Sequence, residues 1–114
     1  MSKDDYFVIV YKILAYLYSC LKSCESADLN YLKCDTDDFP IGISYWEYIF
    51  EHLLNDGYIE GIKLLSVMGK STKSIRVTSG LRITPKGIDY LQNNSAMQKA
   101  KGFFKDLKEI IPGL

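Results

Sequence analysis

His52 is the only histidine of the chain, and it stands beside Glu51, so these two side chains are the first candidates for acid–base catalysis. Adjacent positions of a helix point about 100° apart, however, and a helical Glu51–His52 pair therefore diverges. The chain has no serine in a nucleophile elbow, no glycine-rich loop before a helix and no zinc-binding helix motif. We therefore expect no catalytic residue, no enzymatic activity and no small-molecule substrate.

The thiols of Cys20, Cys24 and Cys34 are the candidate metal ligands. Cys20 and Cys24 share a face of the helix predicted around them, but the paired C-x-x-C spacing of a structural zinc site is missing. An odd number of cysteines in a chain of 114 residues argues against a disulfide framework. We expect reduced, mainly packed thiols in a cytoplasmic protein, with no metal and no cofactor.

Charge is balanced over the whole chain, with 14 basic and 14 acidic residues, but it is segregated along it. Residues 25–60 carry nine acids and the single base Lys33, whereas residues 61–88 carry six bases and no acid. A basic surface of this kind attracts phosphates. The candidate DNA contacts in this stretch are Lys63, Lys70, Lys73, Arg76, Arg82 and Lys86.

Two β-rich runs, 59–67 and 75–83, flank the polar linker Gly69–Ser74, and this pattern predicts a β-hairpin with a basic tip. Arg76 and Arg82 are an even number of residues apart, so a regular strand directs them to one face unless a bulge at Ser79-Gly80 breaks the alternation. Such a wing suits contact with DNA phosphates. The alternatives are a merely solvated loop, or docking of the basic face on the acidic face of another copy.

Five helices are predicted from apolar periodicity and capping signals. The first covers residues 4–24, with an apolar stripe wide enough to be buried on more than one side, and a short second helix covers 27–34. The third has Ser44 as its cap and ends near Asn55 or Asp56, and the fourth begins at Thr84-Pro85, with threonine as cap and proline at the first position. The last begins with Ser95 as its cap and continues through Ile111, before Pro112-Gly113.

In the third helix, Ser44 and Glu47 have the spacing of a capping box. Its inward face is predicted to consist of Trp46, Ile49, Phe50, Leu53 and Leu54. The outward positions are predicted to be Tyr45, Glu47, Tyr48, Glu51, His52 and Asn55. Those able to hydrogen-bond to bases are Tyr45, Tyr48, His52 and Asn55, but phosphates repel the two carboxylates, and neither Lys nor Arg is present. The helix is therefore either a weak base reader, a solvent-facing helix or an acidic surface for a protein partner.

The order of helix, short helix, helix, hairpin and helix is that of an α+β winged helix-turn-helix. The junctions HLLNDGYI (His52–Ile59) and LRITPKGIDYL (Leu81–Leu91) resemble those of bacterial winged-helix proteins. Over its full length, the chain resembles the YjcQ family of small proteins from Firmicutes and their phages. The resemblance implies a winged helix-turn-helix fold and a phage or prophage context, but no established activity.

The sequence divides into a winged-helix domain, 1–94, and an extra C-terminal amphipathic helix, 95–114. The apolar stripe of the tail is predicted to pack on the first helix, within the chain or across a homodimer; its candidate interface residues are Phe103, Phe104, Leu107, Ile110 and Ile111. The apolar run 6–21 is too short to span a bilayer and contains Lys12, so we expect no membrane attachment.

Together these patterns predict a cytoplasmic, non-catalytic DNA-binding module, possessing a phage-type regulatory role and binding duplex DNA as a dimer through its wing. The alternative function is a winged-helix protein–protein interaction module that uses its acidic third helix and binds no nucleic acid.

Overall fold

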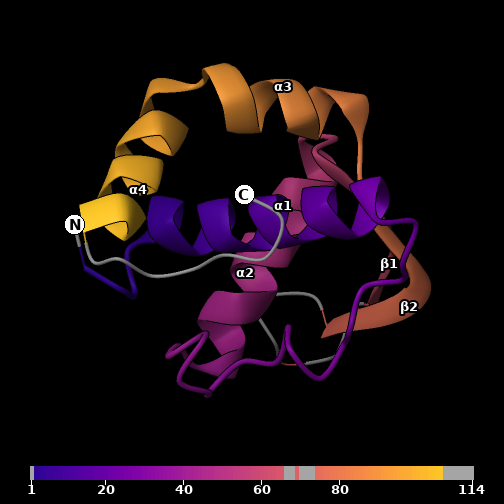
Figure 1. Ribbon diagram of the computed structural model, residues 1–114. Helices are drawn as coiled ribbons and strands as arrows, with labels where there is room; N and C mark the ends of the chain where they lie inside the picture. Colours follow the sequence, from indigo (N-terminus) through magenta and orange to yellow (C-terminus); the bar gives the residue numbers. More distant parts are fainter. Residues whose placement is uncertain (1, 66–68, 70–73, 107–114) are drawn as a thin grey trace.

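Four helices and one two-stranded antiparallel hairpin make up the structure, a computed structural model shown in Figure 1. It describes residues 2–65, 69 and 74–106. The elements in chain order are α1 (Tyr6–Lys22), α2 (Ile43–Asn55), β1 (Ile59–Leu65), β2 (Ser74–Ile83), α3 (Pro85–Asn93) and α4 (Ser95–Asp106). The predicted α+β class is confirmed, as is a hairpin directly after the helix that contains Tyr48.

Helix α1 forms the centre of the core and runs across the molecule beneath α3 in Figure 1. Strand β2 and helices α3 and α4 all pack against it, which is why its apolar stripe is so wide. Its buried apolar residues are Val8, Ile9, Val10, Tyr11, Ile13, Leu14, Ala15, Leu17 and Cys20. The Asp5 carboxylate caps the helix by accepting from the backbone N–H of Phe7 at 3.0 Å. The prediction of a helix over 4–24 was therefore right to within two residues at each end.

Turns occupy the region where a short helix was predicted over 27–34, so that prediction was wrong. Asp28 starts only a single turn. Its carboxylate accepts from the backbone N–H of Asn30 at 2.9 Å, as a helix cap does, and its carbonyl accepts from the N–H of Leu32 at 3.4 Å, while its own N–H donates to the Tyr16 hydroxyl at 2.7 Å. The turn does not continue into a helix, because the Leu32 carbonyl accepts instead from the indole N–H of Trp46.

Helix α2 begins at Ile43, before the predicted cap Ser44, and the predicted capping box is wrong. Gly42 is the N-cap and offers no side chain to the helix. Ser44 therefore lies inside the first turn, too late to cap. Glu47 lies deeper still and is only 4% exposed, so it is not an outward residue as predicted.

The inward face of α2 is otherwise as predicted. Ile49, Phe50 and Leu53 are buried in the core. The indole N–H of Trp46 donates to the Leu32 carbonyl at 2.9 Å and so attaches the preceding turns to α2. Because these contacts hold one side of the helix, only the other side is available to a ligand.

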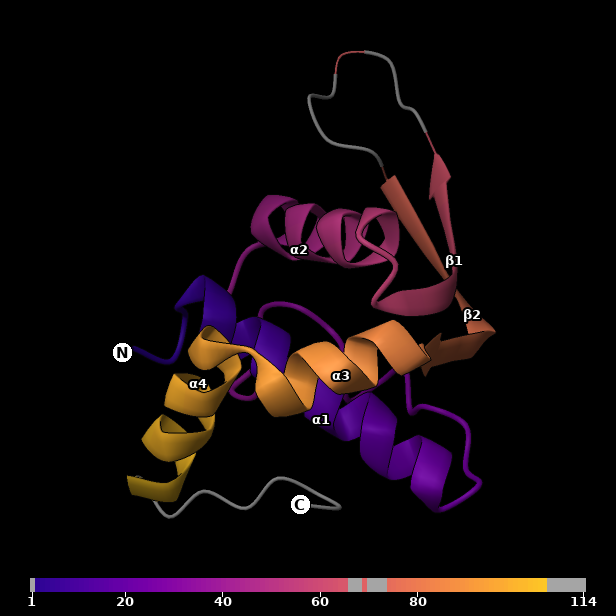
Figure 2. The same ribbon diagram turned by 90° about the horizontal axis from the view of Figure 1, so that it is seen from above.

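A bulge interrupts the pairing of β1 with β2. Glu60 pairs with Arg82, and the next pair along the hairpin is Ile62 with Val77. Between these two pairs, β1 has one residue and β2 has four. Bulges bend a strand and increase its twist. The upper part of the hairpin, which extends past α2 in Figure 2, is therefore turned relative to its base.

Helix α4 packs on α1 of the same chain. The Tyr11 and Phe104 rings stack with their centres 5.7 Å apart. The buried residues of α4 are Met97, Ala100 and Phe104. Its cap is Asn94 rather than the predicted Ser95, because the Asn94 side chain accepts from the N–H groups of Ala96 and Met97. The predicted continuation to Ile111 lies beyond the described residues.

Candidate functional site

Thr84 fastens the base of the hairpin to the end of α2 and caps α3, as predicted. Its hydroxyl donates to the Gly57 carbonyl at 2.5 Å and accepts from the Gly87 N–H at 3.0 Å, while its backbone N–H donates to the Tyr58 carbonyl at 3.0 Å. Gly87 has no room for a side chain, because a Cβ there would lie 2.2 Å from the Tyr58 oxygen. The two junctions that characterise the sequence thus form one contact, which places the hairpin beside α2.

The upper hairpin brings two of the predicted wing residues directly opposite each other. Lys63 on β1 pairs with Arg76 on β2, and the Lys63 side chain is exposed. Lys70 and Lys73 lie outside the described residues, as does the side chain of Arg76. The described part of the wing therefore supplies one exposed cation and the backbone position of a second.

Arg82 lies at the base of the hairpin and is engaged by an acid. Its Nε donates to the Glu60 carboxylate at 2.5 Å across the strands. Both side chains are about half exposed or more, so solvent screens this pair and it contributes little to stability. The bulge lies between Arg76 and Arg82, where the prediction of a common face required regular alternation, and the Arg76 side chain lies outside the described part of the structure.

Lys86 is exposed at the start of α3, but it lies against its own chain. Its Nζ is 5.4 Å from the centre of the Tyr58 ring, a cation–π arrangement. The side chain also passes Gly57, where an added Cβ would meet the Lys86 Cδ at 3.6 Å. Among the described candidate side chains, Lys86 and Arg82 thus lie at the base of the hairpin, each engaged by a group of its own chain, while Lys63 is exposed further along β1.

The candidate base-reading residues of α2 differ in how available they are. Tyr45 is half-buried, and its hydroxyl donates to the Asp4 carbonyl at 2.9 Å. Tyr48 is 45% exposed, with its ring centre 4.3 Å from that of the half-buried His52. Asn55 is exposed at the end of the helix. The available surface of α2 is therefore aromatic and polar, with no basic residue between 43 and 55 other than His52.

Aromatic rings from three helices and from the α2–β1 junction gather on one side of the molecule, an arrangement that the sequence patterns did not predict. We call Tyr6, Phe7, Tyr48, Tyr58 and Tyr90 the aromatic face. The Tyr6 ring centre is 5.2 Å from that of Phe7 and 6.4 Å from that of Tyr48, and Tyr58 stacks on Tyr90 at 4.3 Å. Figure 2 shows the first turn of α1, which carries Tyr6, between α2 and α3.

Tyr6 joins the two halves of the aromatic face. Burial, and then the negative potential of Tyr90, Tyr48 and Asp56, raise the pKa of Tyr6 from 10.0 to about 12. Burial, followed by Tyr58 and Asp56, also raises the pKa of Tyr90. The Asp56 carboxylate therefore lies close to rings from both α1 and α3. No single stretch of sequence contains this grouping, and only the tyrosine-rich composition hinted at it.

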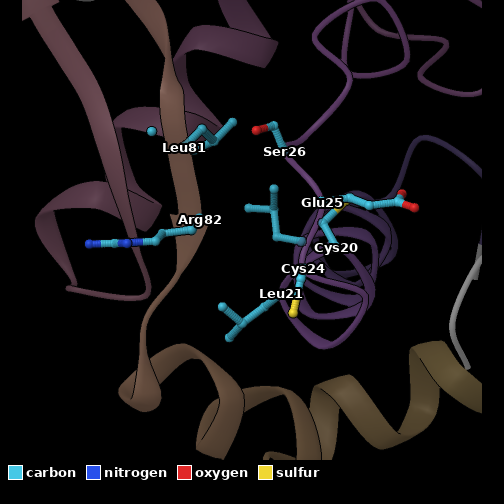
Figure 3. Close-up of a pocket in the computed structure, with 9 residues that line it drawn as sticks. Cys20, Leu21, Cys24, Glu25, Ser26, Leu81 and Arg82 are labelled. Atoms are coloured by element: carbon cyan, nitrogen blue, oxygen red, sulfur yellow. The ribbon is translucent and has the colours of Figure 1, made fainter.

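Cys20 and Cys24 line a pocket between the end of α1 and strand β2 (Figure 3). Cys20 is buried and Cys24 is exposed, and Arg82 extends away from both of them, toward Glu60. Over residues 2–65, 69 and 74–106, no three or more His, Cys, Asp or Glu side chains are grouped so that they could hold a metal ion. The pocket is thus lined by two thiols, and the guanidinium of Arg82, which also lines it, pairs with Glu60 instead.

The tail residues proposed for a dimer interface are only partly within the described chain. Phe104 is 3% exposed because it packs on α1 of its own chain, so it offers no surface to a second copy. Phe103 is half-buried. Leu107, Ile110 and Ile111 lie beyond the described residues. Separately, no helix in the described part of the chain is long and apolar enough to cross a membrane.

The structure defines an α+β protein whose four helices and antiparallel hairpin are compatible with a winged helix. Comparison with protein families gives the particular group. The model of the YjcQ family, described as YjcQ protein, matches residues 11–110, and the chain belongs to this family. No curated protein and no solved structure matches the chain.

Proposed function

We propose that this chain is a non-catalytic winged-helix module that binds duplex DNA, with the hairpin as its wing and α2 in the place of the groove-facing helix. Helix α2 leads directly into the hairpin, and the Thr84 contacts hold the two side by side. We further propose a cytoplasmic, phage-type regulator that acts as a homodimer. The dimer would use surfaces other than Phe104.

The observation that carries this proposal is the Lys63–Arg76 pairing on a stretch, Gly61 to Ile88, that contains six bases and no acid. Phosphate neutralisation supplies most of the non-specific affinity of proteins for DNA. Helix α2 contributes no lysine or arginine, and its Glu51 carboxylate repels phosphates. Affinity should therefore come from the wing, with α2 adding hydrogen bonds from Tyr48 or Asn55.

The experiment is fluorescence anisotropy of the full-length protein with a labelled duplex, from low to physiological salt. We expect binding at low salt that weakens steeply as salt rises, because each neutralised phosphate releases counterions. Glu51→Gln should strengthen non-specific binding by removing a repulsive charge, while Glu25→Gln, at the far end of α1, serves as its matched control. Absence of binding even at low salt would contradict the proposal.

A second candidate function is the binding of a protein partner through α2. It is favoured by large apolar side chains that remain on the surface around this helix: Ile43 is 53% exposed, Tyr48 45% and Phe7 38%. Exposed apolar surface of this kind, next to a carboxylate such as that of Glu51, is typical of protein interaction sites. The DNA titration separates the two, since a protein-interaction module shows no duplex binding.

A further inference from the structure

The aromatic face has the chemistry of a site for a positively charged side chain. The π-faces of tyrosine rings attract cations, and the attraction is strongest where water is partly excluded. Tyr6 and Tyr48 come from different helices and lie 6.4 Å apart, so one cation could contact both rings. The chain already uses this chemistry once, since Lys86 holds its ammonium group over Tyr58.

The electrostatics around the rings point the same way. Asp56 lies at the C-terminal end of α2, and its charge contributes to raising the pKa of both Tyr6 and Tyr90. Helix C-termini carry a partial negative charge, which adds to that of the carboxylate. Within the described part of the chain, Asp56 forms no ion pair. The region thus combines aromatic surface with the Asp56 carboxylate, which repels phosphates and attracts a cation, while the Lys86 ammonium supplies one positive charge where it lies over Tyr58.

We propose that the aromatic face is a docking site for a segment of another protein that presents an arginine or lysine beside an apolar side chain. The cationic group lies against Tyr6, Tyr48 and Asp56, and the apolar side chain lies on the exposed ring of Phe7. Charge complementarity selects this partner over a nucleic acid. The proposal rests on the second candidate function, in which α2 binds a protein and the chain binds no duplex, and it specifies the partner.

The test is selection of a random heptapeptide phage library on the immobilised full-length protein, followed by anisotropy with the enriched peptides in synthetic, labelled form. We expect enriched sequences to contain arginine or lysine next to an apolar residue. Asp56→Asn and Tyr48→Ala should each weaken binding of these peptides about tenfold, as removal of a partly desolvated cation–π or charge interaction does. Both positions are exposed, so circular dichroism should show an unchanged fold.

Glu25→Gln is the matched control, because it removes a carboxylate at the opposite end of α1 and should leave peptide binding unchanged. The proposal is overturned by a failure to enrich any peptide, by enriched peptides without a cation, or by full binding to both variants. It is also overturned if Tyr48→Ala abolishes binding of labelled single-stranded DNA, which would make the face a nucleobase site. Dimerisation that Asp56→Asn abolishes would instead assign the face to a second copy. Duplex binding by the wild type is measured in parallel, and it tests the DNA proposal separately from peptide binding.

Discussion

Gly61 in β1 and Gly80 in β2 approach so closely that a Cβ on Gly61 would lie 2.1 Å from the Gly80 carbonyl oxygen. Gly61 also has a φ of +92°, a conformation that residues with a side chain rarely adopt. This contact lies at the bulge, immediately before the positions where Ile62 turns into the core and Lys63 turns to solvent. The orientation of the proposed wing therefore depends on two glycines.

Gly61→Ala should destabilise the protein by about 3 kcal/mol, because the methyl group meets backbone and the φ is unfavourable for alanine. The measurement is the urea-unfolding midpoint. Gly102→Ala is the control: this glycine is in α4 with nothing within 4 Å of an added Cβ. That change should stabilise by about 0.5–1 kcal/mol through helix propensity. Equal effects of the two substitutions would contradict the close approach at the bulge.

Thr84→Val should cost about 1–2 kcal/mol, because it removes the α3 cap and the bond to the Gly57 carbonyl while keeping the shape of the side chain. Thr84→Ser keeps the hydroxyl and should recover most of the loss. Both are measured by urea unfolding. A valine variant as stable as the wild type would show that the contact between the two junctions does not hold the hairpin to α2.

Cys24→Gly should stabilise the protein by about 0.5–1 kcal/mol, since Cys24 ends α1 in the left-handed region, with a φ of 57°, where glycine is preferred. The N–H of Glu25 donates to the Cys20 carbonyl at 2.9 Å, and that of Cys24 to the Leu21 carbonyl at 3.2 Å, which is the pattern of a Schellman motif. Alanine has a Cβ and is disfavoured in the left-handed region, as cysteine is, so Cys24→Ala controls for removal of the thiol alone. A melting temperature of the glycine variant below that of the alanine variant would refute this explanation.

Tyr6 should make stability fall at alkaline pH. Its pKa rises from 10.0 in the unfolded chain to about 12 in the fold, so the protonated phenol is favoured by folding. The stabilisation is complete below pH 10 and is lost as the pH rises toward 12. Tyr6→Phe retains the ring and cannot ionise, and its urea midpoint should drop less than that of the wild type between about pH 9 and about pH 11.5. A parallel drop in both proteins would contradict the burial of Tyr6 beside Tyr90 and Asp56.

Local signals predicted much of the fold. The apolar periodicity of α1, the inward residues Phe50 and Leu53, and the Thr84-Pro85 start of α3 all act within a few residues along the chain. The errors arose where another local or tertiary bond was stronger. The Leu32 carbonyl bonds the Trp46 indole instead of continuing a helix from Asp28, and Asn94 caps α4 in place of the adjacent serine.

The site was less predictable than the fold, because charge and aromatic content say which residue types are present but not which of them meet. The pairing of Glu60 with Arg82 follows from the bulge, whose size could not be read from the Ser79-Gly80 dipeptide. The aromatic face joins Tyr6 to Tyr90, 84 positions further along the chain, and such a contact has no periodic signal.

The most direct test of DNA binding by the wing is anisotropy of the Lys70→Ala/Lys73→Ala/Arg76→Ala variant with a labelled duplex over a range of salt concentrations. We predict weaker binding to every sequence and a salt slope reduced by about 3, one for each phosphate that the variant no longer neutralises. The control replaces three exposed lysines of α4, Lys99, Lys101 and Lys105, with alanine and should bind as the wild type does. Wild-type affinity and slope in the wing variant would contradict DNA binding through the wing.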